Sequence, residues 1–236
     1  MTMPPVAVLA GGLASRMLPL TQAVPKSLLL VAGEPFIFHQ LRLLRRQGIG
    51  RVVLCIGHLG EQIHQQVGDG AALGLAVDYA SDGATLLGTG GALRQALPLL
   101  GDRFWVLYGD SYLELELAPV LQCFEAAARP ALMTVLRNDN LWGRSNAVYA
   151  AGLVSHYDKR APLPAMHHID YGLSLFRASA FANHPAGAAF DLASLQHDLA
   201  AAGALAGFEV TQRFHEVGSP AGLAALRAHL GGTDAG

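Results

Sequence analysis

Short apolar runs alternate with helical runs through the first half of this chain, and this alternation constrains the fold more than any other feature. The apolar runs predict strands at Val6–Ala10, Arg51–Ile56, Leu75–Tyr79 and Phe104–Tyr108. The intervening segments predict helices at Glu34–Gln47, His58–Val67 and Ala92–Leu99. Strands and helices in this order form βαβ units, which build a largely parallel sheet with helices on both faces. We therefore expect an α/β fold with a Rossmann-like, doubly wound mixed sheet.

After Asp110 the order of elements changes. The pattern predicts a helix at Leu117–Ala128 and then consecutive strands, at Ala131–Arg137, Ala147–Ala150, Val154–Tyr157 and Ile169–Phe176. Consecutive strands joined by short polar turns favour a small antiparallel extension over further βαβ units. A further helix, strand and terminal helix are predicted near Leu192–Ala202, near Phe208–Thr211 and from Ser219–Pro220 onward. Serine is a good N-cap and proline fits the first helical position, which supports that last start.

The composition predicts a compact folded chain that acts on small molecules. Of the 236 residues, 52% are hydrophobic and 14% are charged, so burial can offset the entropy lost on ordering the chain. We expect one domain over residues 1–236. The formal net charge of −2 provides no basic field of the kind that non-specific nucleic-acid binding requires. No run approaches the ~20 apolar residues of a membrane-spanning helix, and no basic segment precedes the first strand, so we expect a cytoplasmic protein without membrane contact.

The cysteines and histidines show no metal-binding spacing. Cys55 and Cys123 are the two cysteines, neither stands in a C-x-x-C pair, and we expect both to be reduced, buried thiols. The chain has 10 histidines, but no H-E-x-x-H motif occurs. His167 and His168 are adjacent and would point in opposite directions on a strand. The sequence therefore favours surface or hydrogen-bonded core histidines over a zinc site.

The segment Leu9–Leu29 carries the clearest candidate for a binding site. Gly11 and Gly12 directly follow the first predicted strand, so they would lie at the carboxyl edge of the sheet, where doubly wound folds bind ligands. Glycines let backbone N–H groups approach an anion, and Arg16 and Lys26 add positive charge. The segment contains neither the Gly-Lys-Ser/Thr of a Walker A loop nor the G-x-G-x-x-G of a dinucleotide fingerprint. We interpret it as a loop that binds a triphosphate.

Several ordered motifs resemble those of the nucleotidylyltransferases that activate sugar 1-phosphates. The run Leu9–Lys26 is similar to that family's GG-x-x-x-R, Pro-Leu-Thr and Pro-Lys signature. The similarity recurs at Val31–Phe36, Gly88–Ala92, Tyr108–Asp110, Tyr157–Lys159 and Glu216–Pro220. The resemblance implies the nucleotide-diphospho-sugar transferase fold, with a nucleotide-binding half at about 1–115 and a sugar-binding half at about 116–236. It also implies the reaction, in which a nucleoside triphosphate and a sugar 1-phosphate give a nucleoside-diphosphate sugar and pyrophosphate.

The resemblance assigns catalytic roles to particular residues. Arg16 would brace the departing β- and γ-phosphates, and Lys26 would bind the α-phosphate or the sugar phosphate. Asp110 would be the first ligand of a Mg²⁺ ion, because hard cations prefer carboxylate and phosphate oxygens. Glu216 stands where many relatives carry a second metal-binding Asp. We therefore predict Arg16, Lys26 and Asp110 as catalytic residues, and Asp110 and Glu216 as ligands of Mg²⁺.

The two substrates would contact different parts of the chain. The resemblance assigns the nucleotide to backbone groups of the first loop and to a glycine turn that leads into the next helix, namely to Leu9, Ala10, Gly11, Gly12, Gly88, Thr89 and Gly90. Thr89 could hydrogen-bond the edge of the base. The resemblance assigns the sugar phosphate to Asp158, Lys159, Asp170 and Gly172. Asp170 departs from the Asn or Thr of many relatives, which leaves the identity of the sugar open.

Two other functions share parts of this pattern. A cytidylyltransferase that acts on phosphocholine would need aromatic side chains around a quaternary ammonium, and aromatic residues make up only 7% of the chain. A non-catalytic protein that binds a nucleotide sugar would tolerate the loss of Arg16, Lys26 or Asp110, and all three are present. Some relatives continue into a hexapeptide-repeat acyltransferase, but no such repeats occur here, so we expect a stand-alone transferase domain. The sequence leaves open whether the protein forms a homo-oligomer.

Overall fold

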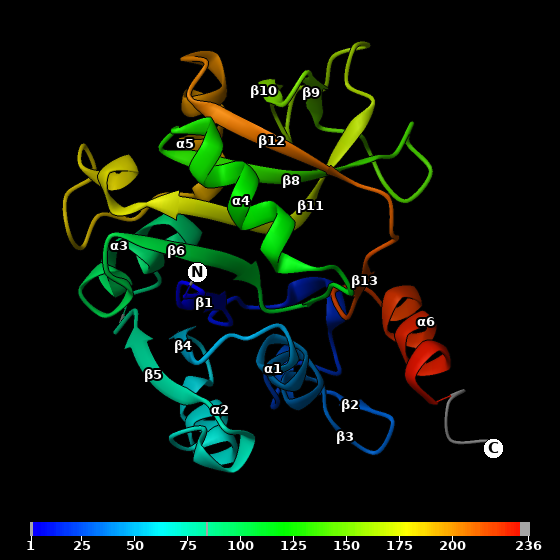
Figure 1. The fold of residues 1–236 in the computed structure, drawn as a ribbon. Coiled ribbons are helices and arrows are strands. Elements are labelled where there is room, and N and C mark those ends of the chain that lie inside the picture. Colours follow the sequence, from blue (N-terminus) through cyan, green and yellow to red (C-terminus); the bar gives the residue numbers. More distant parts are fainter. Residues whose placement is uncertain (1, 84, 232–236) are drawn as a thin grey trace.

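The sheet of the first half is parallel, as the βαβ pattern predicts. The computed structural model describes residues 2–83 and 85–231 (Figure 1). Strand β1 (Val6–Leu9) pairs in parallel with β4 (Arg51–Ile56) on one side and with β6 (Arg103–Tyr108) on the other. β5 (Ala76–Ser81) pairs in parallel with the far side of β4. The chain thus adds strands on one side of β1 and then crosses to the other, which creates a topological switch point at the carboxyl ends of β1 and β6.

The second half of the chain continues the same sheet. Its strands are β8 (Ala131–Arg137), β9 (Ala147–Ala150), β10 (Leu153–Tyr157), β11 (His168–Arg177) and β12 (Leu205–Val210). β11 runs antiparallel to β6 and β8, and β10 runs antiparallel to β9 and β12. The strand order is β5-β4-β1-β6-β11-β8-β12-β10-β9. The predicted extension is mixed rather than purely antiparallel, because β12 enters the sheet beside β8 and runs parallel to it.

Helices cover both faces of this sheet, as expected for a doubly wound fold. Helices α1 (Phe36–Arg46), α2 (Gly60–Val67) and α4 (Leu117–Ala127) pack on one face. Helices α3 (Gly88–Leu100) and α5 (Leu192–Ala201) pack on the other. β1 shows why: Val6 and Val8 join the first apolar core and Ala7 joins the second, since successive side chains on a strand point to opposite faces. The continuous apolar run of β1 is therefore explained by burial on both faces.

A third, smaller core lies beside two short strand pairs that the sequence pattern did not predict. Strand β7 (Ser111–Tyr112) pairs with β13 (His215–Glu216), and β2 (Leu30–Val31) pairs with β3 (Glu34–Pro35). Helix α6 (Pro220–Gly231) packs against both pairs (Figure 1). The buried side chains of this core are Met17, Leu29, Val31, Phe36, Tyr112, Val217, Leu223 and Leu226. Short 3-10 helices lie at Ser15–Met17, Lys26–Leu28, Ala71–Leu73 and Ala178–Phe181.

Most predicted elements are confirmed, with small shifts at their ends. The strands at Arg51–Ile56, Ala131–Arg137 and Ala147–Ala150 have their predicted bounds. The prediction for α3 starts too late: the helix begins at Gly88, so the glycines that were expected to form a turn before it are its first turn. Ser219 caps α6 as predicted, since its Oγ accepts a hydrogen bond from the N–H of Gly222 at 3.0 Å.

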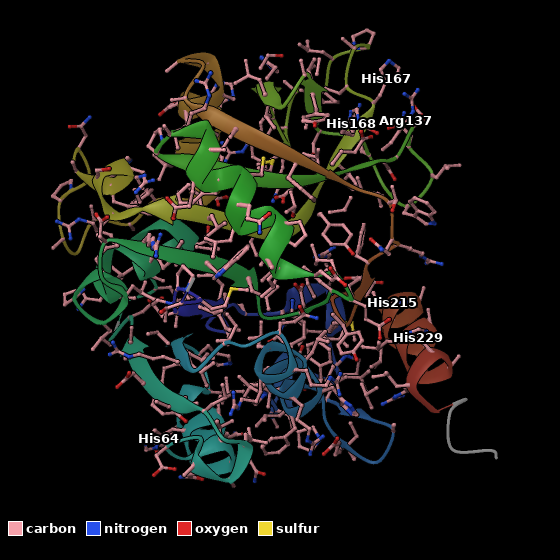
Figure 2. All side chains as sticks on the ribbon, in the orientation of Figure 1. His64, Arg137, His167, His168, His215 and His229 are labelled. Carbon is pink, nitrogen blue, oxygen red and sulfur yellow. The ribbon has the colours of Figure 1, made fainter. Side chains whose placement is uncertain are left out.

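The histidine and cysteine predictions have mixed outcomes. His167 is exposed and His168 is buried, so the two adjacent side chains do point in opposite directions (Figure 2). Cys55 is buried as predicted, whereas Cys123 is partly exposed, and both are free thiols. Among the helices that the structure describes, none has both the length and the apolar character needed to cross a membrane.

Candidate active site

A cavity of about 220 Å³ opens at the topological switch point. The loops that follow β1 and β6 form two of its sides. The cavity collects most of the residues predicted to bind the nucleotide, together with Lys26 and Asp110; its lining is Leu9, Ala10, Gly11, Gly12, Lys26, Ser27, Cys55, Asp82, Leu86, Gly88, Thr89, Ala92, Tyr108, Gly109 and Asp110. The glycine-rich segment therefore lies where the βαβ pattern placed it, at the carboxyl edge of the sheet.

Gly11 is required by a close approach of two loops. A Cβ atom at Gly11 would lie 2.8 Å from the backbone nitrogen of Gly57, which follows β4. Ala10 holds the same contact by donating its N–H to the carbonyl of Cys55 at 2.9 Å. The loop after β1 thus rests directly on the loop after β4, and a larger residue at position 11 would force them apart. The glycine is explained by packing as well as by the need for exposed N–H groups.

The structure places only part of the predicted glycine turn at the start of α3 in the first cavity, namely Gly88 and Thr89. Gly90 does not line the cavity: its N–H donates to the carbonyl of Phe190 at 3.0 Å, and a Cβ atom there would lie 2.2 Å from the Phe190 ring. Thr89 lines the cavity, but its hydroxyl donates to Asp191 at 2.7 Å and accepts from the N–H of Leu192 at 2.8 Å. Both residues tie α3 to the start of α5, and the hydroxyl of Thr89 is already paired.

A second, more polar cavity of about 290 Å³ adjoins the first. It brings together Arg16, Asp110, Lys159, Asp170, Gly172 and Glu216, all of which the sequence assigned to catalysis, metal or sugar phosphate. The remaining lining residues are Tyr108, Ser111, Asn146, Ile169, Tyr171 and Phe214. Tyr108 and Asp110 line both cavities. The end of β6 is therefore the boundary between them.

Charged groups meet at this boundary. Lys26 donates to Asp110 Oδ2 at 2.6 Å, which joins the 3-10 turn of the glycine-rich segment to the end of β6. Both carboxylate oxygens of Glu216 are held at the start of α6. Its Oε1 accepts from Ser219 Oγ at 2.6 Å, and its Oε2 accepts from the N–H of Gly218 at 2.9 Å. These bonds fix the direction in which each carboxylate points.

Gly218 marks the point around which these charges gather. A Cβ atom added there would lie 2.4 Å from Glu216 Oε2, 2.8 Å from Asp110 Oδ2 and 3.5 Å from Arg16 Nη2. The two carboxylates thus face one small region that a side chain at position 218 would fill. Two carboxylates beside space for phosphate oxygens form the kind of donor set that Mg²⁺ prefers. The residues present fit a Mg²⁺ ion.

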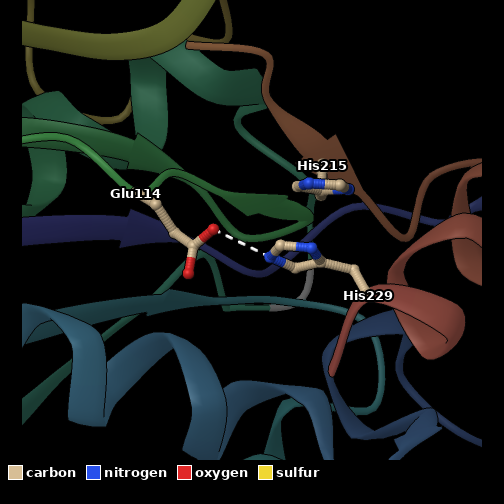
Figure 3. Close-up of side chains that lie close together, drawn as sticks. All are labelled: Glu114, His215 and His229. Carbon is tan, nitrogen blue, oxygen red and sulfur yellow. Dashed lines mark hydrogen bonds and ion pairs between the residues drawn. The ribbon is translucent and has the colours of Figure 1, made fainter. Parts of the chain in front are cut away.

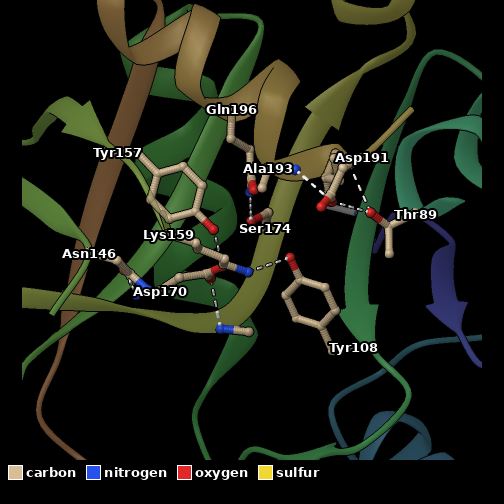
Figure 4. Close-up of polar contacts among 12 residues, drawn as sticks. Thr89, Tyr108, Asn146, Tyr157, Lys159, Asp170, Ser174, Asp191, Ala193 and Gln196 are labelled. Carbon is tan, nitrogen blue, oxygen red and sulfur yellow. Dashed lines mark hydrogen bonds and ion pairs between the residues drawn. The ribbon is translucent and has the colours of Figure 1, made fainter. Parts of the chain in front are cut away.

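Lys159 is held at the sugar side of the boundary by two oxygens (Figure 4). Its Nζ lies 3.3 Å from the hydroxyl of Tyr108 and 3.4 Å from Asp170 Oδ2. It also lies 4.9 Å from the centroid of the Tyr108 ring. Burial lowers the pKa of Lys159, but the oxygens of Tyr108 and Asp170 outweigh that effect and leave its pKa above the usual value. The ammonium group is therefore a permanent positive charge in this cavity.

Asp170 is the buried anchor of that lysine, with a side chain only 3% exposed. Tyr157 donates its hydroxyl to Asp170 Oδ2 at 2.9 Å, and the N–H of Gly172 donates to Oδ1 at 3.0 Å. Asn146 Oδ1 accepts from the backbone N–H of Asp170 at 2.9 Å. Each carboxylate oxygen of Asp170 thus already has a partner within the protein, and Oδ2 also holds Lys159 in place.

Asp158, which the sequence assigned to the sugar phosphate, does not line either cavity. Its Oδ1 accepts from the N–H of Arg160 at 2.6 Å and of Ala161 at 2.9 Å. These bonds make Asp158 the first residue of a turn and lower its pKa. Aspartate is common at such turns because its side chain mimics a backbone acceptor. The adjacent residue Lys159 points the other way, into the second cavity.

Sequence reasoning missed several side chains of the site. Tyr108 stands inside a recognised motif but received no role, although burial raises its pKa to about 12 and its hydroxyl accepts from Lys159. Asn146, which lines the second cavity, received no role either. Asp82 follows β5 and lines the first cavity, and burial raises its pKa. Its place at the carboxyl end of a strand beside the switch point was the signal that could have revealed it.

The whole arrangement agrees with a known family. Residues 6–141 match the nucleotidyl transferase family. The chain belongs to this family. A match over that range includes the glycine-rich segment, α3 and the end of β6, which together build the first cavity.

Individual members of this nucleotidyl transferase family match about half of the chain. It is 40% identical over 116 residues to an N-acetylmuramate α-1-phosphate uridylyltransferase of Neisseria meningitidis, covering 49% of this chain and 50% of that protein. It is 34% identical over 130 residues to a glucose-1-phosphate thymidylyltransferase of Streptomyces antibioticus, covering 55% and 36%. It is 37% identical over 115 residues to a mannose-1-phosphate guanylyltransferase of Mycobacterium tuberculosis, covering 48% and 32%. The chain thus spans half or less of the length of each of these relatives.

Solved structures resemble the fold over nearly the full length. HddC from Yersinia pseudotuberculosis, solved in complex with GMP-PN, superposes with a TM-score of 0.81 at 21% identity, covering 97% of this chain and 100% of that one. A UDP-glucose pyrophosphorylase from Acinetobacter baumannii gives a TM-score of 0.76 at 16% identity, covering 99% and 95%. The fold is thus of the nucleotide-diphospho-sugar transferase type.

Proposed function

We propose that this nucleotidyl transferase joins a nucleoside triphosphate to a sugar 1-phosphate, with release of pyrophosphate and with Mg²⁺ as cofactor. The observation that carries the proposal is the meeting of two cations and two carboxylates, Arg16, Lys26, Asp110 and Glu216, where the two cavities join. The named activities of the relatives, which transfer uridylyl, thymidylyl or guanylyl groups to sugar phosphates, support the same reaction.

The two cavities suit the two substrates. The first has the loops of a nucleotide site, and the second contains the fixed positive charge of Lys159 for a phosphate monoester. A monoester has a second pKa near ~6, so the attacking phosphate is already ionised at neutral pH. The reaction then needs neither a covalent nucleophile nor a general base from the protein. It needs the reacting groups held in line and the developing charge neutralised.

The charged residues at the junction would supply that neutralisation. Arg16 would brace the phosphates that leave as pyrophosphate, since a guanidinium can donate to two oxygens at once. Lys26 is paired with Asp110 in this structure, and it would turn to the α-phosphate when the triphosphate binds. Asp110 and Glu216 would hold Mg²⁺, which would supply positive charge beside the transferring phosphate. The pairing of Lys26 with Asp110 keeps both groups aimed at the junction until the substrates arrive.

The phosphocholine alternative fits the second cavity poorly. A quaternary ammonium would need the face of an aromatic ring. Lys159 already lies 4.9 Å from the centroid of the Tyr108 ring, so one cation occupies the neighbourhood that the other would need. The two positive charges would repel each other. A sugar 1-phosphate carries no quaternary ammonium, so Lys159 would attract its phosphate without this repulsion.

A pyrophosphate-release assay tests the proposal. The chain is incubated with Mg²⁺ and with each pair drawn from four nucleoside triphosphates and a panel of sugar 1-phosphates, beside Asp110→Ala and Arg16→Ala. We expect one pair to release pyrophosphate with the wild type. Arg16→Ala should be slower by about 10²–10³-fold, as for the loss of one preorganised charge, and Asp110→Ala should be inactive. Activity that is no higher in the wild type than in the variants for every pair would overturn the proposal.

A further inference from the structure

Three metal-binding side chains that are distant in the sequence meet beside α6 (Figure 3). Glu114 follows β7, His215 begins β13 and His229 lies in the last turn of α6. One ligand atom from each lies within 4.8 Å of the other two. Among residues 2–83 and 85–231, which the structure describes, the group of His, Cys, Asp or Glu side chains with ligand atoms this close together is Glu114, His215 and His229. It is separate from the junction of the two cavities, whose carboxylates are Asp110 and Glu216.

The group has the composition of a zinc site. His229 Nε2 lies 2.8 Å from Glu114 Oε2, and the ring centroids of His215 and His229 lie 4.2 Å apart. Two imidazoles and one carboxylate are the three protein ligands of well-known zinc centres that keep a fourth position open to water. Imidazole ligands also favour Zn²⁺ over Mg²⁺, which prefers oxygen donors alone. We propose that Glu114, His215 and His229 form a binding site for one Zn²⁺ ion.

A small adjustment would complete the geometry. A metal ion lies in the plane of each imidazole that binds it, whereas these two rings stack with only 19° between their planes. One ring must therefore turn. His229 can turn, because its side chain is 38% exposed and its hydrogen-bond partner Glu114, at 46% exposed, can move with it. Tetrahedral Zn²⁺ with ligand distances of ~2 Å holds its ligand atoms about 3.3 Å apart. The three ligand atoms lie within 4.8 Å of one another, so each pair must approach by at most about 1.5 Å.

The proposed zinc site shares its supporting elements with the candidate active site. In the β7–β13 pair, His215 lies opposite Tyr112 and Glu216 lies opposite Ser111, which follows Asp110. Helix α6 begins beside Glu216, through Ser219, and carries His229 near its other end. An ion bound to Glu114, His215 and His229 would therefore fasten the end of α6 to the strand pair that carries Glu216 and directly follows Asp110, the two carboxylates proposed to bind Mg²⁺. This coupling rests on the proposed function, whereas the binding of Zn²⁺ does not.

Calorimetric titration with Zn²⁺ tests the site directly. Wild type, His229→Ala, Glu114→Gln and the control His64→Ala are titrated with ZnCl₂ in buffer that contains excess Mg²⁺, which competes with Zn²⁺ for the carboxylates of Asp110 and Glu216. His64 is a surface histidine on α2, remote from the site (Figure 2). We expect one equivalent of Zn²⁺ to bind to the wild type and to His64→Ala with equal affinity. His229→Ala and Glu114→Gln should bind at least tenfold more weakly, as for the loss of a ligand or of its supporting group.

The result also has a spectroscopic and a thermal readout. Co²⁺ in place of Zn²⁺ should give the visible absorption of a four- or five-coordinate ion in the wild type and not in His229→Ala. Saturating Zn²⁺ should raise the Tm of the wild type, because it binds the folded state, and should leave the Tm of His229→Ala almost unchanged. Absence of binding by the wild type, or equal affinity in wild type and both site variants, would overturn the proposal.

The outcome is independent of the pyrophosphate assay. A chain that binds Zn²⁺ through these residues but transfers no nucleotide keeps the zinc site and loses the proposed function. A chain that transfers nucleotide but binds no Zn²⁺ does the reverse. If both hold, adding Zn²⁺ to the Mg²⁺-loaded enzyme should change kcat in the wild type and leave kcat of His229→Ala unchanged, which would demonstrate the coupling through β13.

Discussion

At the scale of single residues, the candidate site depends on positions where one atom decides the geometry. Gly218 is the clearest case, because the absence of a Cβ there lets Asp110 and Glu216 face the same region. Gly218 belongs to a segment that resembles a motif of the family. The sequence does not show that two carboxylates, one of them more than a hundred positions away, share the space beside this glycine. Its role is therefore steric and depends on tertiary contacts.

We predict that Gly218→Ala severely reduces nucleotidyl transfer. The new Cβ would lie 2.4 Å from Glu216 Oε2 and 2.8 Å from Asp110 Oδ2, so at least one carboxylate must move. Misplacement of a positioned group by about 1 Å can cost about 10²-fold in rate. The measurement is kcat/KM with saturating Mg²⁺. Gly50→Ala is a matched control, because nothing lies within 4 Å of a Cβ at that position, and its activity should equal that of the wild type. If Gly218→Ala keeps the kcat/KM of the wild type, the absence of a side chain at position 218 is not needed for the metal site.

At the scale of elements, two short strands and one helix position the acidic side of the site. The β7–β13 pair brings the end of β6 next to the start of α6, and both segments are too short to show a periodic pattern in the sequence. The sequence did predict the start of α6 correctly, because capping by Ser219 and Pro220 is a local signal. It could not show that Ser219 also donates to Glu216, since the Glu216 side chain must first turn back onto the helix start.

We predict that Ser219→Ala lowers both stability and activity. Loss of the N-cap should reduce the free energy of unfolding by about 1 kcal/mol, which chemical denaturation would measure. Glu216 Oε1 also loses its donor, so the apparent affinity for Mg²⁺ in the transfer reaction should fall as well. Ser219→Thr restores the hydroxyl and should recover most of both properties. An effect on stability with an unchanged Mg²⁺ dependence would limit Ser219 to capping.

At the scale of the whole molecule, one sheet carries both halves of the candidate site. β6 lies between β1 of the first half and β11 of the second, and the two cavities meet at its end. The two apolar cores on the faces of this sheet bury groups from both halves of the chain. One of these groups is Cys55, which is buried on β4 beneath the first cavity.

We predict that burial of Cys55 makes stability fall at high pH. Burial raises the pKa of the Cys55 thiol to about 12, whereas an unfolded chain has a cysteine pKa of about 8.5. Above about pH 8.5 the unfolded state therefore binds fewer protons than the folded state, and the free energy of unfolding falls by about 1.4 kcal/mol per pH unit from this group. Cys55→Ala lacks that contribution.

Denaturation at pH 8 and at pH 10 measures this effect. The wild type should lose about 2 kcal/mol more than Cys55→Ala between the two pH values, since about 1.5 pH units separate pH 10 from the unfolded pKa. Tyrosines titrate alike in both proteins and cancel in the difference. In addition, a thiol reagent at pH 8 should leave Cys55 unmodified in the native protein. Equal losses in the two proteins would contradict the assigned pKa.

The sequence by itself determined the local features of this protein. Apolar periodicity identified most helices and strands because it reflects which faces each segment buries. The glycine-rich segment indicated a candidate phosphate site because Gly11, Gly12, Arg16 and Lys26 are close neighbours in the chain. Motifs further along, such as Tyr108–Asp110, also lie at the site.

Only the tertiary structure decided which distant side chains meet. The tertiary structure packs Gly90 against Phe190, uses Asp158 in a turn and places β12 parallel to β8. It also brings Glu114, His215 and His229 together. The physical reason is that such contacts depend on strand order and on the direction of each side chain. Both are set by the packing of the complete sheet, whereas a local sequence pattern reports only on the segment that contains it.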